Sequence, residues 1–254
     1  MVDGPAYHPA RLLARADAGG GMTRVTVDPG DAVAATYRAP GQYVEVRTRG
    51  ETGYFVLAGQ PGISPWELVM RAGGGASDVL LGDAPDRVIE ITAAIGEGFP
   101  MGELRGHPVV VALGGTGIAA GPPLVARRIA DGDAARTRVF VGVRAPDELA
   151  LVAELAAWRD AGVEVLVCAW QGDAGAASSS GDPASSFAGP ATSAGSPAEG
   201  AAAFRGYVQE AVVTLVSPGS VRAVLAVGVG PMIEALRGHA PALGIAREHV
   251  LTNH

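Results

Sequence analysis

The residues with the clearest chemical potential form a glycine-rich turn directly after an apolar run. Val109–Leu113 contains only apolar residues, and Gly114-Gly115-Thr116-Gly117-Ile118-Ala119-Ala120 follows it, with a G-x-G-x-x-A spacing from Gly115. Glycines in such a turn let the backbone approach a pyrophosphate, and the start of the next helix favours its negative charge. The segment therefore predicts a dinucleotide site, with an ordinary strand-to-helix connection as the alternative.

A second glycine turn ends another apolar run near the C-terminus. Gly228-Val229-Gly230-Pro231-Met232 follows Ala223–Val227. In parallel sheets, ligands bind at the carboxyl ends of the strands, so two such turns in one domain are expected to flank a single ligand. The alternative is a pair of ordinary connections without a ligand.

These turns need elements that hold them, and the chain after residue 108 predicts alternating strands and helices. The expected strands are Val109–Leu113, Arg138–Val143, Val163–Ala169, Ala223–Val227 and Val250–Leu251, and the expected helices are Pro122–Ala130, Glu148–Ala161 and Pro231–His239. Continuous apolar strands that alternate with helices indicate a doubly wound parallel sheet covered on both faces. Within this region, Gly172–Ala203 is almost wholly Gly, Ala, Ser and Pro, and we expect a disordered insertion there, at 172–203.

The region up to about residue 103 has a different pattern. Short strands are expected at Val25–Val27, Tyr43–Arg47, Tyr54–Ala58, Trp66–Met70 and Val88–Thr92, with one helical turn at Ser77–Leu81. Short strands separated by turn residues indicate a small antiparallel β-barrel. We therefore predict a barrel domain at 1–104 and an α/β domain at 105–254, with the boundary near Met101–His107.

The composition excludes several other kinds of chemistry. A formal net charge of −7 and a pI of about 5.2 disfavour nucleic acid as a partner, which would require a basic face. The chain contains no lysine, so neither Schiff-base catalysis nor a P-loop nucleotide site is available. A single cysteine, Cys168, and five scattered histidines predict neither an internal disulfide nor a metal site.

Two segments bear on localisation. Met1–Leu13 carries charged residues and no apolar run, so we expect no signal peptide. The uncharged stretch Pro108–Ala126 holds four glycines and three prolines, which disfavours a membrane-spanning helix. A cytoplasmic protein is expected.

Six motifs, taken in order, resemble the ferredoxin–NADP reductase superfamily over nearly the whole chain. They are Pro40-Gly41-Gln42-Tyr43-Val44, Gly74-Gly75-Ala76-Ser77, Gly114-Gly115-Thr116-Gly117-Ile118-Ala119, Gly142-Val143-Arg144-Ala145-Pro146-Asp147-Glu148-Leu149, Gly206-Tyr207-Val208 and Gly228-Val229-Gly230-Pro231-Met232. The closest similarity is to a stand-alone branch typified by a kiwi fruit protein. The resemblance implies FAD, or less readily FMN, on the barrel and NADH or NADPH on the α/β domain. Hydride would pass from the nicotinamide to the flavin, and electrons would continue to an unidentified acceptor, a protein among the alternatives.

The resemblance also assigns residues to the flavin. Alignment on Leu57-Ala58-Gly59 places Gly53, Tyr54, Phe55 and Val56 on the family motif R-x-Y-S. Phe55 retains a ring that can stack on the flavin, while the phosphate-binding arginine and the hydroxyl are absent. Tyr54 to Leu57 would contact the flavin, with Phe55 and Val56 at the reaction centre. On the residues alone, the two aromatics could equally be ordinary barrel side chains.

Two further segments correspond to flavin contacts in the family. Val69-Met70-Arg71 would run beside the flavin, with Arg71 supplying the phosphate charge, and Gly74-Gly75-Ala76-Ser77 would bind the pyrophosphate. The alternatives are a solvated surface arginine and a helix-capping serine without a ligand.

The nicotinamide site implied by the resemblance lies in the second domain. It comprises Gly115, Thr116, Gly117, Ile118, Gly142, Arg144, Gly228, Gly230, Pro231 and Met232. Val227 stands at the reaction centre where the family usually has a cysteine. Trp170-Gln171 occupy the place where NADP-preferring relatives have Ser-Arg, which favours NADH.

Two other functions fit parts of the sequence. The departures at Gly53, Val56 and Val227 suggest a degenerate nucleotide-binding or electron-transfer-complex subunit with little catalytic activity. A Rossmann-type dehydrogenase without flavin is the other alternative, although the strand-rich first hundred or so residues count against it.

Overall fold

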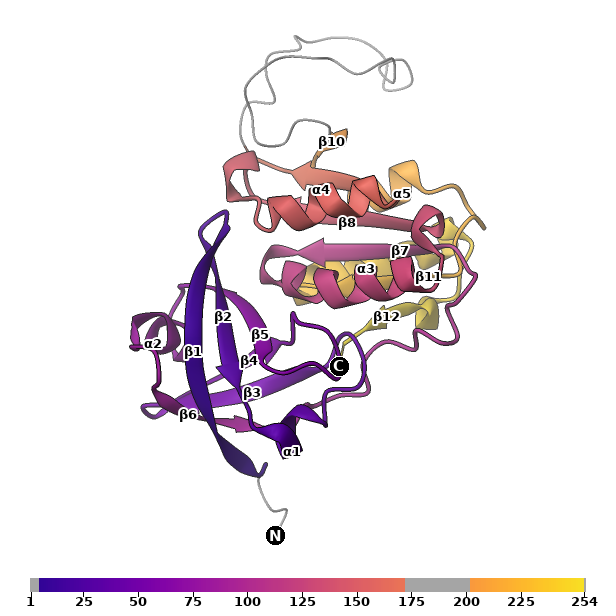
Figure 1. Ribbon diagram of the computed structural model, residues 1–254. Coiled ribbons are helices and arrows are strands. Elements are labelled where there is room, and N and C mark those ends of the chain that lie inside the picture. Colours follow the sequence, from indigo (N-terminus) through magenta and orange to yellow (C-terminus); the bar gives the residue numbers. More distant parts are fainter. Residues whose placement is uncertain (1–4, 172–201, 254) are drawn as a thin grey trace.

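Two six-stranded sheets divide the chain between them, one antiparallel and one parallel (Figure 1). The computed structural model describes residues 5–171 and 202–253. The antiparallel sheet has the order β4-β3-β6-β1-β2-β5 and the parallel sheet the order β10-β9-β8-β7-β11-β12. The predicted fold class, a β-barrel domain followed by a doubly wound α/β domain, is confirmed. The flavin-free Rossmann alternative does not account for this barrel.

The antiparallel sheet closes on itself to form a barrel. Its elements are β1 (Tyr7–Gly19), β2 (Met22–Asp28), β3 (Tyr43–Thr48), β4 (Glu51–Val56), β5 (Trp66–Arg71) and β6 (Val88–Thr92), with the short helices α1 (Asp31–Ala34) and α2 (Ala76–Gly82). The two edge strands meet through a bridge between Leu57 and Leu68, and the Ala58 amide donates to the Glu67 carbonyl at 2.8 Å. Alternate residues such as Val44 and Val46 point into the core.

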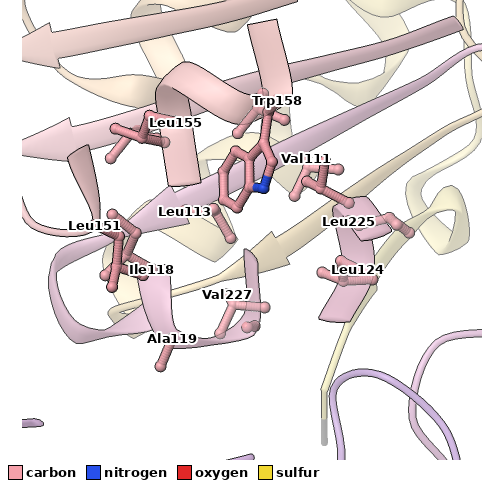
Figure 2. Close-up of a cluster of buried hydrophobic side chains, with 14 of the residues drawn as sticks. Val111, Leu113, Ile118, Ala119, Leu124, Leu151, Leu155, Trp158, Leu225 and Val227 are labelled. Carbon is pink, nitrogen blue, oxygen red and sulfur yellow. The ribbon is translucent and has the colours of Figure 1, made fainter. Parts of the chain in front are cut away.

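The parallel sheet carries helices on both faces. Its strands are β7 (Val109–Gly114), β8 (Thr137–Val143), β9 (Glu164–Ala169), β10 (Ala202–Arg205), β11 (Ala223–Val227) and β12 (Val250–Thr252), and its helices are α3 (Gly121–Ala130), α4 (Val152–Asp160), α5 (Val208–Leu215) and α6 (Gly230–His239). Val111 and Leu113 face the cluster under α3 and α4, whereas Val110 and Ala112 face the cluster under α5 and α6. Figure 2 shows the first cluster, in which Trp158 lies over the sheet.

The strand order reverses at β7, and this reversal places the site. The chain proceeds outward from β7 through β8 and β9 to β10, and then returns to β11 on the other side of β7. Ligands of such sheets bind where the order reverses, at the carboxyl ends of the strands. Both glycine turns found in the sequence, after Leu113 and after Val227, lie at this point.

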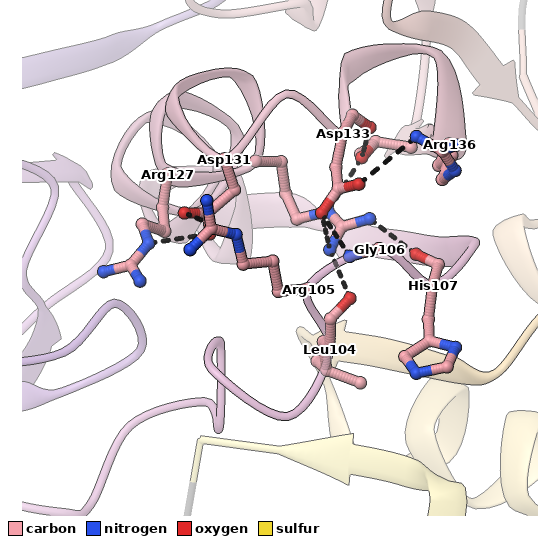
Figure 3. A network of polar contacts seen from close by, with 10 residues as sticks. Leu104, Arg105, Gly106, His107, Arg127, Asp131, Asp133 and Arg136 are labelled. Atoms are coloured by element: carbon pink, nitrogen blue, oxygen red, sulfur yellow. Dashed lines mark hydrogen bonds and ion pairs between the residues drawn. The ribbon is translucent and has the colours of Figure 1, made fainter.

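A buried arginine fixes the segment that connects the two sheets. Arg128 on α3 is fully buried and donates to the carbonyls of Leu104 and His107 at 2.7 and 2.6 Å. It also lies 3.1 Å from the Asp133 carboxylate, which accepts from the Gly106 amide (Figure 3). Burial lowers the pKa of Arg128 despite the nearby carboxylate. The connection is thereby held against the α/β domain.

Three predicted elements differ from the structure. The helix predicted at Glu148–Ala161 begins only at Val152, because Leu151 adopts a left-handed φ of 56° and its amide donates to the Ala18 carbonyl of the barrel. The strand predicted at Tyr54–Ala58 is Glu51–Val56, since the chain leaves β3 at Leu57 to close the barrel.

The third difference concerns the end of the predicted insertion. Ala202 and Ala203 belong to β10, which pairs with β9 in parallel register, so the prediction of disorder up to residue 203 is wrong at its end. Residues 172–201 lie outside the described residues. Within the described ranges, no helix combines the length and apolar character that crossing a bilayer requires.

Candidate functional site

A cleft of about 520 Å³ lies between the barrel and the carboxyl edge of the parallel sheet. Residues of β4 and β5, together with the following turn, form one wall. The ends of β7 and β11 form the other wall, and Asn253, after β12, completes the lining. Asn253, the last residue that the structure describes, therefore lies beside both domains.

The α/β wall consists of backbone that comes too close for side chains. A Cβ at Gly117 would lie 2.3 Å from the Val227 carbonyl oxygen, and a Cβ at Gly228 would lie 3.2 Å from the Gly114 backbone. Met232 packs behind them, with its sulfur 2.8 Å from the position of a Cβ on Gly114. Because the two turns contact each other, they present one continuous peptide surface to the cleft.

The barrel wall consists mainly of side chains. Tyr54 is 66 % exposed at the rim and makes an edge-to-face contact with Tyr43 at 6.0 Å between ring centroids. The charge of Glu45 raises the pKa of Tyr54, so its phenol remains protonated at neutral pH. Phe55 and Val56 are half-buried and line the cleft beside it. This wall offers an apolar surface to a planar ring.

Arg71 is the only charged side chain that lines the cleft in the described parts of the chain. Its Nη2 donates to the Gly20 carbonyl at 2.8 Å, and its Nη1 lies 3.5 Å from a carboxylate oxygen of Glu148 on the other domain. The guanidinium is about one-third exposed. The guanidinium can therefore bind an anion in the cleft while the Gly20 carbonyl and Glu148 fix its position.

The glycine turn before α2 lies next to Arg71. Ser77 donates its hydroxyl proton to the Gly74 carbonyl at 2.8 Å, and the Gly73 amide donates to the Asp78 carboxylate at 2.9 Å. Nothing lies within 4 Å of the position of a Cβ on Gly73 or Gly74. The turn has room for a ligand, but its serine proton and one amide are already engaged.

The structure brings twelve of the residues predicted as site residues to this cleft. They are Tyr54, Phe55, Val56, Val69, Met70, Arg71, Ser77, Gly115, Thr116, Gly117, Val227 and Gly228. Val227, predicted at the reaction centre, thus lies in one cleft with Phe55 and Val56. The two glycine turns, predicted to flank one ligand, also face the same space.

Other predicted residues do not line the cleft. They are Leu57, Gly74, Gly75, Ala76, Ile118, Gly142, Arg144, Gly230, Pro231 and Met232. Leu57, Ile118 and Met232 pack in the hydrophobic cores. At Gly142, a Cβ would lie 2.5 Å from a methyl of Val208, so packing of α5 explains this glycine.

Six lining residues are not among the residues assigned to the site from the sequence, although Gly114, Ala119 and Val229 belong to the two predicted glycine turns: Ala72, Gly73, Gly114, Ala119, Val229 and Asn253. Five of them adjoin predicted residues. Asn253 is different, because only the pairing of β12 with β11 brings it to the site. The rule that ligands bind at strand carboxyl ends, applied to the expected strand Val250–Leu251, was the signal that could have found it.

Two features on and directly after β9 lie apart from the cleft. Trp170, after β9, stacks on Tyr207, before α5, with 5.1 Å between ring centroids. Cys168 is fully buried on β9, and burial raises the pKa of its thiol to about 12. This cysteine is therefore neutral, and it is not part of the cleft lining.

Comparison with known proteins places the fold. No protein-family model and no curated protein matches the chain. A cytochrome P450 reductase from Amycolatopsis matches with a TM-score of 0.75 at 21 % identity, covering 100 % of this chain and 72 % of the other. A ferredoxin–NADP⁺ reductase from Neisseria gonorrhoeae with bound FAD and NADP matches with a TM-score of 0.71 at 13 % identity, covering 97 % of each chain.

A third solved structure is the cytochrome b5 reductase domain of nitrate reductase from Ulva prolifera. Its TM-score is 0.71 at 13 % identity, and the match covers 97 % of this chain and 98 % of the other. The matches extend over both domains and over the cleft between them. The chain therefore has the two-domain fold of the ferredoxin–NADP reductase-like proteins.

Proposed function

We propose that this protein is a flavin-dependent NAD(P)H oxidoreductase. The observation that supports this most is the cleft itself, in which an apolar barrel wall with one cation faces two glycine turns at the reversal point of a parallel sheet. Its volume of about 520 Å³ lies within the range usual for small-molecule sites, about 300–1,000 Å³. A flavin on the barrel side and a nicotinamide on the other side would share this space.

The barrel residues suit a flavin in part. Tyr54, Phe55 and Val56 would contact the ring, and Arg71 would supply the charge opposite a phosphate. The Gly74–Ser77 turn would approach the pyrophosphate. FAD is favoured over FMN because the cleft continues past Arg71 to Ser77, which leaves room for a second phosphate.

The α/β residues suit a nicotinamide dinucleotide. The exposed peptides of Gly115 and Thr116 would meet its phosphates, while Val227 and Gly228 would lie near the nicotinamide. When bound, the flavin accepts hydride from the nicotinamide and passes electrons on to an acceptor. The contribution of this chain is to hold the two rings in contact and to exclude water between them.

Within this proposal, NADH is the favoured coenzyme. Trp170 and Gln171 bring no cation to the edge beyond β9, and the nearby Arg144 is already paired with Glu148. A 2′-phosphate would therefore find no cation on Trp170 or Gln171 and would have to compete with Glu148 for Arg144.

A second candidate function is a nucleotide-binding subunit with little catalysis. A Cβ at Gly53 would lie 3.0 Å from the Phe55 ring and 3.2 Å from Ala76, so this part of the wall is closed to a larger side chain. Arg71 alone would then carry the phosphate charge, and Val56 and Val227 bring no polar group to the reaction centre.

Absorbance spectroscopy distinguishes these candidates. The purified protein is incubated with FAD, desalted and titrated anaerobically with NADH and, separately, NADPH. Retained flavin that bleaches supports the reductase, and bleaching at lower NADH than NADPH supports the coenzyme preference. Retained flavin that does not bleach supports the second candidate, whereas no retention of flavin contradicts both.

A variant tests the assignment of Arg71. Arg71→Gln should weaken FAD binding by about 10-fold, the loss expected for one charge-assisted hydrogen bond. Arg138→Gln is the matched control, because Arg138 pairs with Glu164 at the opposite, amino edge of the sheet. Equal FAD affinity in the two variants would show that Arg71 does not bind the flavin.

A further inference from the structure

Three charged side chains form a chain across the domain boundary. Glu148 lies between Arg71 of the barrel and Arg144 at the end of β8. One carboxylate oxygen is 3.5 Å from Arg71 Nη1, and the other is in close contact with Arg144 Nη2. One negative charge therefore serves two guanidinium groups.

The backbone at Glu148 is fixed by the barrel. Gly20, in the turn between β1 and β2, approaches so closely that a Cβ there would lie 2.2 Å from the Glu148 carbonyl oxygen. Three residues after Glu148, the Leu151 amide donates a hydrogen bond to the Ala18 carbonyl at 2.8 Å. Because these two contacts hold the main chain against the barrel, Glu148 responds to its surroundings mainly through its side chain.

The exposures show which member of the trio is shared. The Glu148 side chain is 17 % exposed, against 36 % for Arg71 and 60 % for Arg144. Both arginines can thus reach solvent or a ligand, while the carboxylate is enclosed between them. Stronger pairing of Glu148 with one arginine weakens its hold on the other.

We propose that Glu148 is a shared counter-ion, a positioning residue that links the charge at Arg144 to the availability of Arg71 in the cleft. This rests on the proposed function for its ligands. When a phosphate of the dinucleotide pairs with Arg144, Glu148 pairs more strongly with Arg71. Arg71 then binds a flavin phosphate less strongly. The two nucleotides consequently oppose each other's binding, and this linkage is reciprocal.

Variants of the trio give opposite signs in one measurement, the dissociation constant for FAD from quenching of flavin fluorescence. Glu148→Gln frees Arg71 and should tighten FAD binding by about 2- to 5-fold, the range expected of a partly exposed ion pair. Arg144→Ala removes the arginine that competes for Glu148, so Glu148 pairs with Arg71 alone and FAD binding should weaken by a similar factor. In the Glu148→Gln background, Arg144→Ala should have no effect.

A merely structural role predicts a different pattern, since both single variants would weaken FAD binding. That pattern overturns the proposal. Glu164→Gln is the control, because it removes a carboxylate paired with an arginine on the same domain but away from the cleft. It should leave the affinity unchanged.

The linkage itself is tested with ADP-ribose, which carries the dinucleotide phosphates without the nicotinamide. Saturating ADP-ribose should raise the dissociation constant for FAD about 2- to 5-fold in the unmodified protein and not in Glu148→Gln. An equal shift in both proteins would show that Glu148 does not transmit it, and would overturn the proposal.

A ligand-free measurement separates failure of this inference from failure of the proposed function. If FAD does not bind, the proposed function fails, and the counter-ion is judged by chemical unfolding. A double-mutant cycle for Arg71 and Glu148 should give a larger coupling in an Arg144→Ala background than in the unmodified protein. Equal couplings in the two backgrounds would overturn the shared counter-ion.

Discussion

The two walls of the cleft are built on different principles. On the α/β side, main-chain atoms of two glycine turns approach each other so closely that a methyl group has no place at Gly117. On the barrel side, exposed side chains such as Tyr54 form the surface. The α/β wall depends on the absence of Cβ atoms at its glycines, so a single added methyl group should distort it. The barrel wall depends on exposed side chains, so removing their atoms should cost little stability.

The largest expected effect follows from adding a methyl group to the backbone wall. In Gly117→Ala the new Cβ meets the Val227 carbonyl oxygen at 2.3 Å, and both partners belong to the main chain at the switch point. One strand end must shift, which should reduce the free energy of unfolding by about 3 kcal/mol. The free energy of unfolding is measured by urea titration with circular dichroism as the probe.

Gly230→Ala is the matched control for this prediction. Gly230 lies in the same glycine turn as Gly228, and nothing lies within 4 Å of the position of its Cβ. Its free energy of unfolding should change by less than about 0.5 kcal/mol. If the two variants were equally stable, close approach of the backbone would not define this wall.

The contrast between the walls also explains how much the sequence could predict. Glycine turns after apolar strands are local signals, because steric exclusion at the strand ends leaves few other residues possible. Gly117 and Gly228 were accordingly found at the cleft. Asn253 was not, because its place depends on which strand β12 pairs with.

The same reasoning applies to whole elements. β1 (Tyr7–Gly19) was not predicted as a strand, because few of its residues are buried and their alternation is irregular. The start of α4 was predicted too early. A contact between Leu151 and Ala18, over a hundred residues away in the chain, keeps the residues before Val152 out of the helix. Elements set by local steric rules were predictable, whereas the strand β1 and the start of α4, which depend on pairing and contacts distant in the chain, were not.

A smaller effect is expected at the second glycine turn. In Gly228→Ala the new Cβ lies 2.8 Å from the terminal methyl of Met232, which can move, and 3.2 Å from the backbone of Gly114. Because a flexible side chain absorbs most of the contact, the free energy of unfolding should fall by about 1 kcal/mol, less than for Gly117→Ala. A loss equal to that of Gly117→Ala would mean that Met232 is as rigid as the main chain.

The smallest effect on stability is expected at the rim of the side-chain wall. Tyr54 is 66 % exposed, so Tyr54→Ala loses little beyond its edge-to-face contact with Tyr43, and the free energy of unfolding should change by about 0.5 kcal/mol. FAD affinity should nevertheless fall about 5-fold, because the apolar surface offered to the ring is reduced.

Tyr54→Phe separates the ring from the hydroxyl. It keeps the aromatic surface and removes the group whose pKa the Glu45 charge raises. If Tyr54 serves as a surface for the flavin, Tyr54→Phe should bind FAD as the unmodified protein does, while Tyr54→Ala binds it more weakly. If both variants bound FAD with unchanged affinity, the rim of this wall would not contact the flavin, and contacts on the barrel side would have to come from Phe55, Val56 and Arg71 deeper in the cleft.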